Sequence, residues 1–198
     1  MYKNYVKTII DWIIASIALV ILAPVLVITA IAIRIESKGN VFFLQDRLGR
    51  YGKTFKVIKF RSMVVQHPKG KTNNKLYEND PRITKVGRFI RKTSIDELPQ
   101  LINILKGEMS FLGPRPPVTY FPKRFEEYTD FEKQRFDVKP GISGLAQVRC
   151  REIHDWSINI PIDVEYVQNY SFSYDAKLFF TSLTFFFRTD NIYRKESK

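Results

Sequence analysis

The 198-residue sequence contains a single cysteine, Cys150, and so cannot form an intramolecular disulfide. One unpaired thiol fits a reducing compartment. Only two histidines occur, His67 and His154, and without a cysteine pair they do not support a zinc site. The sequence also lacks a G-x-x-x-x-G-K-[ST] loop and a G-x-G-x-x-G motif, so neither P-loop nor Rossmann-type nucleotide binding is supported. Internal repeats and low-complexity tracts are absent as well.

Acidic side chains are in the minority. The 20 Asp and Glu residues face 32 Lys and Arg residues, which gives a formal net charge of +12. This excess favours an anionic partner, such as phosphates, nucleic acid or acidic lipid headgroups. The 16 phenylalanines and 10 tyrosines suit either base stacking or a membrane interface. The length fits one domain.

The stretch from Trp12 to Ile33 carries no charged residue and is long enough to span a bilayer as a helix. It is too long for the apolar part of a signal peptide, and no small-residue cleavage site followed by polar sequence is evident. Pro24 lies near its middle, where proline removes a backbone hydrogen bond and kinks a helix. The sequence therefore predicts a membrane helix that is broken near Pro24.

Positive charge flanks both ends of this stretch, whereas a spanning helix has a one-sided bias toward the cytoplasm. A helix that enters the membrane, breaks at Pro24 and returns to the same face satisfies both flanks. An ordinary signal-anchor helix with a tolerated proline is the alternative, and the sequence leaves the two open. The flanking cations are Lys3 and Lys7 on one side and Arg34, Lys38, Arg47, Arg50 and Lys53 on the other.

Two short segments rich in aromatic and β-branched residues follow, 41–45 and 54–60, and the glycine-containing stretch 46–53 between them predicts a β-hairpin. The polar stretch 65–80 predicts a loop. Periodic order resumes over 82–91, where Ile83, Val86, Phe89 and Ile90 share one face.

The segment 93–107 holds two adjacent carboxylates, Asp96 and Glu97, at a predicted helix start. Ser94 and Glu97 match a capping box, but that register puts Pro99 at the fifth helical position, where a backbone bond is lost. We favour Asp96 as the cap, because Pro99 then occupies the third position without cost. Both carboxylates would lie at the positive end of the helix dipole, which favours their ionised forms.

In this register one apolar stripe is predicted, and Gly107 ends the helix. The simpler alternative is a capping Asp96 and a surface acid at Glu97. The stripe consists of Leu98, Leu101, Ile102 and Leu105.

Arg115 lies between prolines in the segment 110–117. Those prolines restrict the backbone, and a guanidinium held in this way suits a phosphate, which it can bind through two parallel hydrogen bonds. Nearer the C-terminus, the apolar stretch 175–188 is too short to span a membrane. It fits an interfacial helix or a core helix equally well.

Taken together, these segments resemble the bacterial sugar transferases of the monotopic phosphoglycosyl transferase family, over nearly the whole chain. The resemblance is most specific in Lys59-Phe-Arg-Ser-Met63, Arg91-x-x-Ser94-Ile-Asp-Glu-Leu-Pro-Gln-Leu101, Leu105-Lys-Gly-Glu-Met-Ser-Phe-Leu-Gly-Pro-Arg-Pro116 and Lys139-Pro-Gly-Ile-Ser-Gly-Leu-Ala-Gln-Val148. It implies a mainly α protein with a small β-hairpin, monotopic in the membrane. Residues 1–38 would form a re-entrant membrane helix, and residues 39–198 a cytoplasmic catalytic domain with interfacial amphipathic helices.

The resemblance also implies a reaction, in which a UDP-sugar gives its sugar-1-phosphate to undecaprenyl phosphate and UMP leaves. By position, Asp96 would be the nucleophile and Glu97 would hold Mg²⁺, while the anion-binding groups would be Lys59, Arg91, Arg115 and Arg151. General chemistry agrees, since a carboxylate can act as a nucleophile in phosphoryl transfer and a diphosphate calls for a divalent ion and cationic groups. The partners would be the UDP-sugar, undecaprenyl phosphate and the cytoplasmic face of the bacterial inner membrane, without nucleic acid. A homodimer is left open.

Two positions depart from the family pattern. Ala23 stands before Pro24 where serine is frequent, so the kink would rest on the proline and on packing. Arg149-Cys150-Arg151 replaces Asn-Gly-Arg, so Arg149 competes with Arg151 for the phosphate role. A different class of function, a non-enzymatic membrane-anchored basic protein that binds anionic lipid or nucleic acid, explains the charge and the aromatics equally well. It does not explain the carboxylate pair or the proline-framed arginine.

Overall fold

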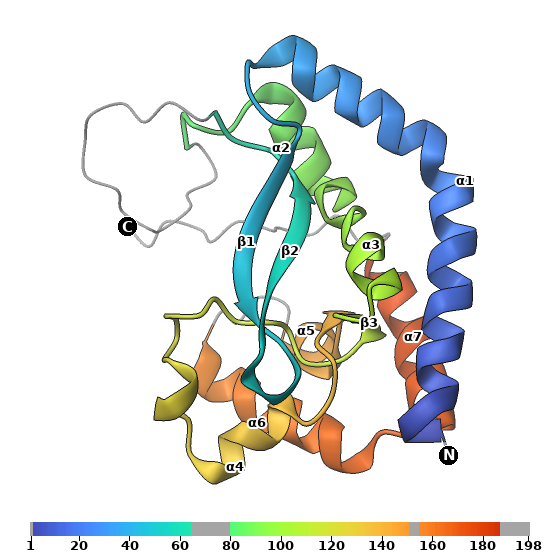
Figure 1. Cartoon of the computed structure of the whole chain (residues 1–198), viewed down its shortest axis with the longest axis vertical. Helices are drawn as coiled ribbons and strands as arrows, with labels where there is room; N and C mark the ends of the chain where they lie inside the picture. Colours follow the sequence, from blue (N-terminus) through green and yellow to red (C-terminus); the bar gives the residue numbers. More distant parts are fainter. Residues whose placement is uncertain (1, 65–79, 151–154, 187–198) are drawn as a thin grey trace.

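A computed structural model describes residues 2–64, 80–150 and 155–186. The predicted hairpin is confirmed: strand β1 (Phe42–Leu48) pairs antiparallel with β2 (Thr54–Phe60), with Phe42 opposite Phe60. Strand β1 runs beyond the predicted segment 41–45, because Asp46, Arg47 and Leu48 continue the ladder as far as Thr54. The hairpin stands near the middle of the molecule (Figure 1). The predicted loop over 65–80 lies almost entirely outside the described residues.

The prediction of a mainly helical chain is also confirmed. A second small sheet was not predicted: β3 (Ser110–Leu112) pairs parallel with β4 (Gly141–Ser143). The long first helix is α1 (Lys7–Glu36), which follows a π-helical turn, η1 (Tyr2–Val6). The other helices are α2 (Lys85–Lys92), α3 (Gln100–Leu105), α4 (Asp130–Lys133), α5 (Leu145–Arg149), α6 (Trp156–Asn169) and α7 (Phe172–Phe186). Short 3-10 turns are η2 (Arg50–Gly52), η3 (Ile95–Glu97), η4 (Phe125–Glu127) and η5 (Gln134–Phe136).

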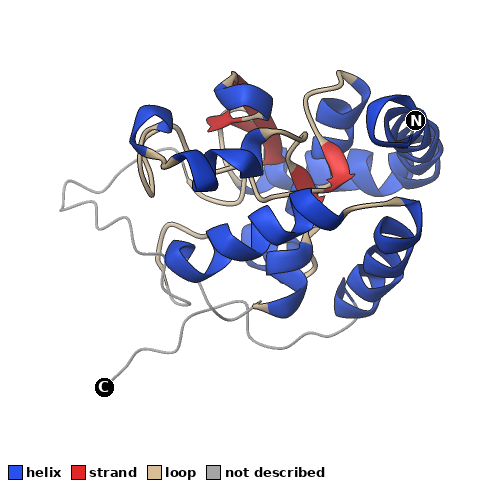
Figure 2. Ribbon diagram, turned by 90° about the horizontal axis from the view of Figure 1, so that it is seen from below, coloured by secondary structure: helices blue, strands red, loops and turns tan. Residues whose placement is uncertain are grey.

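Helix α1 is long and apolar enough to cross a membrane, and only 11% of its most apolar 18-residue stretch is buried within the protein. It is therefore not a core helix. It contains Pro24 and bends near its middle along one side of the molecule (Figure 1). Figure 2 views it nearly end-on, beside the remaining elements.

Both halves of α1 pack against the same body. Before Pro24, Ala15 is fully buried in a cluster with Leu101 and Ile104 of α3. After Pro24, Ile33 is buried with Phe60 of β2 and Ile90 of α2. A straight helix crossing a bilayer would carry one of these halves away from the protein, so the bend keeps the whole helix on one face of the folded body.

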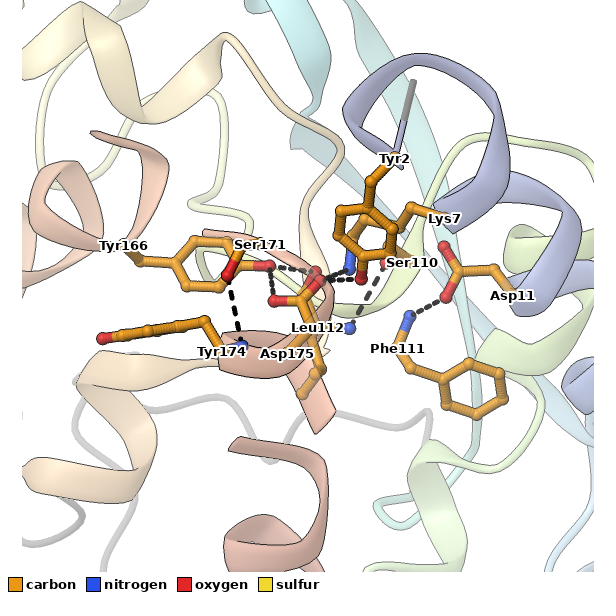
Figure 3. Close-up of polar contacts among 10 residues, drawn as sticks. All are labelled: Tyr2, Lys7, Asp11, Ser110, Phe111, Leu112, Tyr166, Ser171, Tyr174 and Asp175. Atoms are coloured by element: carbon orange, nitrogen blue, oxygen red, sulfur yellow. Dashed lines mark hydrogen bonds and ion pairs between the residues drawn. The ribbon is translucent and has the colours of Figure 1, made fainter. Parts of the chain in front are cut away.

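A buried polar cluster fixes the N-terminal end of α1 (Figure 3). The Asp175 carboxylate of α7 accepts hydrogen bonds from the Tyr2 hydroxyl at 2.6 Å, the Lys7 Nζ at 2.7 Å and the Tyr166 hydroxyl at 2.8 Å. Asp11 accepts a hydrogen bond from the Phe111 backbone N–H of β3 at 3.3 Å. Lys7, read in the sequence as a flanking membrane-side charge, therefore points into the protein.

The C-terminal end of α1 is held in a different way. The Glu36 carboxylate accepts the backbone N–H groups of Lys85 and Val86, at 2.6 and 2.9 Å, and so satisfies two free donors in the first turn of α2. The buried Arg61 guanidinium donates to the carbonyls of Ser37 and Lys38, both at 2.7 Å. The two ends of the apolar helix are thus attached to the folded body.

Helix α7 covers residues 175–186 of the stretch that was predicted as either an interfacial or a core helix. Its inner face buries Asp175, Leu178 and Ser182. Its outer face leaves Phe172 and Phe180 exposed by 60% and 67%. It is therefore a core helix on one side and carries exposed phenylalanines on the other.

Candidate active site

The carboxylate pair lies where the chain turns between α2 and α3. Ser94 adopts a left-handed conformation with φ 56°, and Ile95–Glu97 then form the 3-10 turn η3. The prediction that Asp96 caps a helix is wrong, because Asp96 lies inside this turn and the residue before α3 is Pro99. The Ser94 side chain makes no capping bond either, so the alternative capping box is also absent. Proline has no N–H to satisfy, which makes it compatible with the entrance of α3.

The buried face of α3 also differs from the predicted stripe. Leu101 is buried as expected, but Leu105 is 37% exposed, and Ile104 and Asn103 are fully buried. The reason is that α3 packs on two sides, against α1 and against β2, so its buried surface is wider than one stripe. Gly107 does end the helix as predicted, at a positive φ of 77°.

Two segments distant from η3 in the sequence bring charged groups to the Glu97 carboxylate. Lys59 of β2 lies 2.6 Å from Glu97, measured between Nζ and Oε1, and both side chains are largely buried. Arg115 approaches the same oxygen with an amino nitrogen at 3.9 Å. The structure therefore places Lys59 and Arg115 beside Glu97, whose chain neighbour is Asp96, although Lys59 and Glu97 are 38 residues apart in the sequence.

The two neighbouring carboxylates differ electrostatically. Burial, and after it the adjacent Glu97 charge, raise the pKa of Asp96 to about 6, although Lys59 and Arg91 act in the opposite direction. Burial also opposes ionisation of Glu97, but Lys59, Arg115 and Arg47 outweigh it and lower the pKa of Glu97 to about 2. The expectation that both carboxylates are favoured as ions thus holds for Glu97 and not for Asp96.

Arg47 is a site residue that the sequence analysis placed only among the flanking cations. Its guanidinium donates to the Pro116 carbonyl at 2.9 Å and to Gln45 Oε1 at 2.7 Å. Burial, with the nearby Arg115 charge, lowers the pKa of Arg47 to about 10, and Glu97 opposes that shift. Nothing in the sequence distinguishes Arg47 from the many other cations of the hairpin; its strand register does.

Asn103 is a second residue that the sequence did not single out. It is fully buried and ties α3 to the hairpin. Its side-chain oxygen accepts the Ile58 backbone N–H at 3.1 Å, and its amide nitrogen donates to the Lys56 carbonyl at 2.8 Å and to Glu108 at 2.7 Å. Because Ile58 precedes Lys59, this bond sets the position of Lys59 relative to the helix that follows Asp96 and Glu97.

The segment Gly113–Pro117, here called the arginine loop, carries Arg115. It packs backbone to backbone against the Lys139–Gly144 segment: a Cβ atom on Gly113 would overlap the Lys139 carbonyl oxygen, and one on Gly141 would overlap the Gly113 nitrogen. These close approaches give the second glycine-containing motif a structural role, since only residues without side chains allow the arginine loop to lie so near.

The remaining predicted cations are distributed differently. Arg91 lies on α2 and is close enough to lower the pKa of Asp96 by its charge. Arg149 is held on the surface by Glu165 of α6 at 2.6 Å. Arg151 lies outside the described residues, so the choice between Arg149 and Arg151 stays a prediction.

The arrangement suits binding and transfer of a phosphorylated group. A half-buried carboxyl lies beside an ionised one, with a lysine and several arginines around them. Among the residues that the structure describes, no three His, Cys, Asp or Glu side chains gather to form a metal site by themselves. Mg²⁺ commonly takes one or two protein carboxylates and completes its coordination with substrate phosphates and water, so the pair fits that ion in the presence of a phosphate ligand.

Comparison with known proteins agrees with this chemistry. The family model described as "Bacterial sugar transferase" matches residues 2–189. A UDP-glucose:undecaprenyl-phosphate glucose-1-phosphate transferase of Escherichia coli (strain K12) is 39% identical over 87% of this chain and 38% of its own length. A UDP-N-acetylgalactosamine-undecaprenyl-phosphate N-acetylgalactosaminephosphotransferase of Aeromonas hydrophila is 39% identical over 90% of this chain and 43% of its own length.

A shorter relative aligns over most of its length. The UDP-glucose:undecaprenyl-phosphate glucose-1-phosphate transferase of Caulobacter vibrioides is 36% identical over 94% of this chain and 72% of the relative. The chain thus spans about two fifths of the two longer relatives, 38% and 43%, and about seven tenths of the third, 72%.

Proposed function

Because the chain belongs to the bacterial sugar transferase family, we propose that it transfers a sugar-1-phosphate from a UDP-sugar to undecaprenyl phosphate, with release of UMP. The observation that carries this proposal is the meeting of Lys59, the Asp96–Glu97 pair and Arg115 at one place, with Lys59 at 2.6 Å from Glu97. Cations from β2 and from the arginine loop would receive the diphosphate, and a carboxyl group stands beside it.

The proposed reaction has two displacements at one phosphorus atom. An Asp96 carboxylate oxygen attacks the phosphorus next to the sugar, the bond to the bridging diphosphate oxygen breaks, and UMP leaves with the electron pair. A phosphate oxygen of undecaprenyl phosphate then attacks the same phosphorus and displaces the Asp96 carboxylate. Splitting the transfer in this way replaces one difficult step by two easier ones. Lys59 and Arg115 stabilise charge on the phosphoryl oxygens in both steps.

Mg²⁺ is proposed as the cofactor, held by Glu97. When bound, the ion would neutralise charge on the diphosphate. Glu97 suits this role because the surrounding cations keep its pKa at about 2, so its carboxylate is ionised at neutral pH. Removal of divalent ions with a chelator is expected to abolish UMP release and leave the circular dichroism spectrum of the protein unchanged.

The protein is proposed to be monotopic, with α1 re-entrant in the cytoplasmic leaflet of the bacterial inner membrane. The exposed apolar side chains of α1 support contact with lipid, and the packing of both its halves on one body supports a return to the same face. The acceptor phosphate lies at the headgroup level of such a membrane, so the carboxylate pair would lie just above it.

The experiment that tests the proposal uses the full chain in vesicles that contain undecaprenyl phosphate. UMP release is measured in these vesicles with a panel of UDP-sugars. The intact protein mass is measured in a second sample, which contains the UDP-sugar but no undecaprenyl phosphate. The wild-type chain is expected to gain the mass of one phosphosugar, whereas Asp96→Asn is expected to show neither the mass gain nor UMP release. The control is Glu126→Gln, an exposed acid in the turn η4, which should behave as wild type.

Three results would count against the proposal. Unchanged UMP release by Asp96→Asn would remove Asp96 as the nucleophile. A phosphosugar adduct at another residue would move the reaction away from η3. Membrane binding without UMP release from any UDP-sugar would favour a non-enzymatic lipid-binding protein.

A further inference from the structure

The arginine loop is held in place by its carbonyl oxygens. Pro114, Pro116 and Pro117 have no backbone N–H, so the loop has few donors of its own. The last four carbonyls of the loop, from Pro114 to Pro117, each accept a hydrogen bond from another part of the protein. These pairs are the Gly141 N–H to Pro114 at 3.0 Å, Arg135 to Arg115 at 3.0 Å, Arg47 to Pro116 at 2.9 Å and the Leu48 N–H to Pro117 at 3.0 Å.

The donor to the carbonyl of Arg115 itself is a buried guanidinium. The Arg135 side chain has no exposed surface, and its ion pair with Asp163 of α6 joins an amino nitrogen and Oδ2 at 2.6 Å. The Arg135 Nε also donates to that oxygen, at 3.2 Å, and the amino nitrogen that binds Asp163 donates to the Arg115 carbonyl. The aromatic rings of Phe136 and Trp156 lie 5.1 and 5.3 Å from the guanidinium carbon. Its orientation is therefore set from several sides.

A small hollow that is partly open to solvent adjoins this loop, and it is lined among others by Pro114, Pro116 and Arg135. One Arg135 amino nitrogen is buried without a hydrogen-bond partner among the described residues. A buried ion pair is also a weak source of stability, because desolvation of the two charges offsets most of their attraction. The effect of the Arg135–Asp163 pair at this place is to fix the position of the Arg135 guanidinium.

We propose that Arg135, oriented by Asp163, is a positioning residue that holds the Arg115 guanidinium beside Glu97 for the diphosphate of the sugar donor. The inference rests on the proposed function, since it assigns Arg115 to that diphosphate. Neither Arg135 nor Asp163 touches the substrate; they act through the Arg115 backbone. A displacement of Arg115 by about 1 Å is enough to cost on the order of 100-fold in rate.

The test is a double-mutant cycle on UMP release by the full chain in vesicles. Asp163→Asn is expected to lower kcat/KM by at least about tenfold in the wild-type background, mainly through a higher KM for the UDP-sugar. In the Arg115→Ala background the same change is expected to have no further effect, because there is no guanidinium left to position. If Asp163→Asn prevents folding, Arg135→Lys takes its place in the cycle, since lysine keeps the charge and loses the fixed fork of donors.

The matched control breaks a different bond between the same two elements. Gln168 of α6 donates to Gln134 of η5 at 2.9 Å, and neither residue is a donor to the four loop carbonyls described above. Gln168→Ala should leave kcat/KM within about twofold of wild type. Equal losses from Asp163→Asn with and without Arg115 would overturn the inference and reduce the pair to a structural role, while the Asp96 reaction would stand. Full activity of Arg115→Ala alone would also overturn it. Failure to detect a phosphosugar adduct on Asp96 in the wild-type chain, in contrast, would contradict the proposed function itself.

Discussion

Asp96 and Glu97 are adjacent in the chain and yet meet different surroundings. The cations Lys59, Arg115 and Arg47 all act on Glu97, which lies 2.6 Å from Lys59. Burial dominates at Asp96, with the Glu97 charge adding to it. A pair of carboxyl groups whose pKa values are pushed apart by their environments fits two separate roles. At the scale of the residue, the protein therefore holds the two carboxyl groups in different electrostatic surroundings, which is what the proposed roles require.

Lys59 is the residue that most directly maintains this difference. Lys59→Met removes the closest cation from Glu97 and one positive charge from the proposed diphosphate site. We expect kcat to fall by about 100-fold or more, in line with the loss of one donor aimed at developing charge. Lys59→Arg, which keeps the charge, should retain more activity than Lys59→Met. Equal activity of wild type and Lys59→Met in the UMP-release assay would remove Lys59 from the site.

The sequence predicted Asp96, Glu97 and Arg115 as site residues from their residue types and context, and Lys59 from the family resemblance. It did not identify Arg47, Asn103 or Arg135. An asparagine inside an apolar helix and one arginine among many have no distinctive pattern, and their roles depend on contacts such as Asn103 with Lys56 at 2.8 Å. Those contacts exist only after the hairpin has docked on α3.

At the scale of elements, Asn103 joins α3 to β2 as a buried clamp. Asn103→Asp keeps the shape of the side chain but replaces its donor nitrogen by an acceptor, which then faces the Lys56 carbonyl and the Glu108 carboxylate. We expect a loss of about 1–3 kcal/mol in the free energy of unfolding. UMP release should fall as well, because Lys59 follows the clamped Ile58 by one residue. Urea denaturation checks the first effect, and an unchanged midpoint would contradict the clamp.

The reversal between α2 and η3 depends on Ser94, a non-glycine residue at φ 56°. A left-handed conformation costs a residue with a Cβ roughly 1–2 kcal/mol, and a β-branched side chain tolerates it least. Ser94→Val should therefore unfold at a lower temperature than Ser94→Gly, with wild type between them or near the glycine variant. Thermal unfolding followed by circular dichroism measures the order. A valine variant as stable as the glycine variant would mean that the turn relaxes to another conformation.

Element types were predictable where periodicity is strong, as in the hairpin, α2 and α1. The start of α3 was not, because a 3-10 turn and a left-handed residue replace the expected cap. The parallel pair of β3 and β4 was not predicted either. Its strands are only three residues each, too short to give an alternating pattern.

At the scale of the whole molecule, the bent α1 connects two distant parts of the folded body, α7 and α2. Its N-terminal end is tied to α7 through Lys7 and Asp175 at 2.7 Å, and its C-terminal end to α2 through Glu36 and the Lys85 N–H at 2.6 Å. The proposed topology therefore places the segments before and after α1 on one side of the membrane.

Single-cysteine variants test that topology. In a Cys150→Ser background, Lys3→Cys and Lys53→Cys introduce one thiol on each side of α1, at exposed positions. A membrane-impermeant maleimide is expected to label both variants in inverted vesicles and neither in intact cells. Labelling of the two positions from opposite sides would show a spanning helix and contradict the re-entrant one.

The two attachments of α1 also fix the rotation of one end of the helix relative to the other and the distance between them. An inserted residue turns everything beyond it by about 100° and adds about 1.5 Å of length. One extra residue between Lys7 and Glu36 would therefore swing the Glu36 carboxylate away from α2, whatever the hydrophobicity of the insert, and four extra residues would nearly restore its direction but not its reach. The length of an ordinary membrane helix is matched to the lipid around it. The length of α1 is instead set by its two attachments to the folded body, at Lys7 and at Glu36.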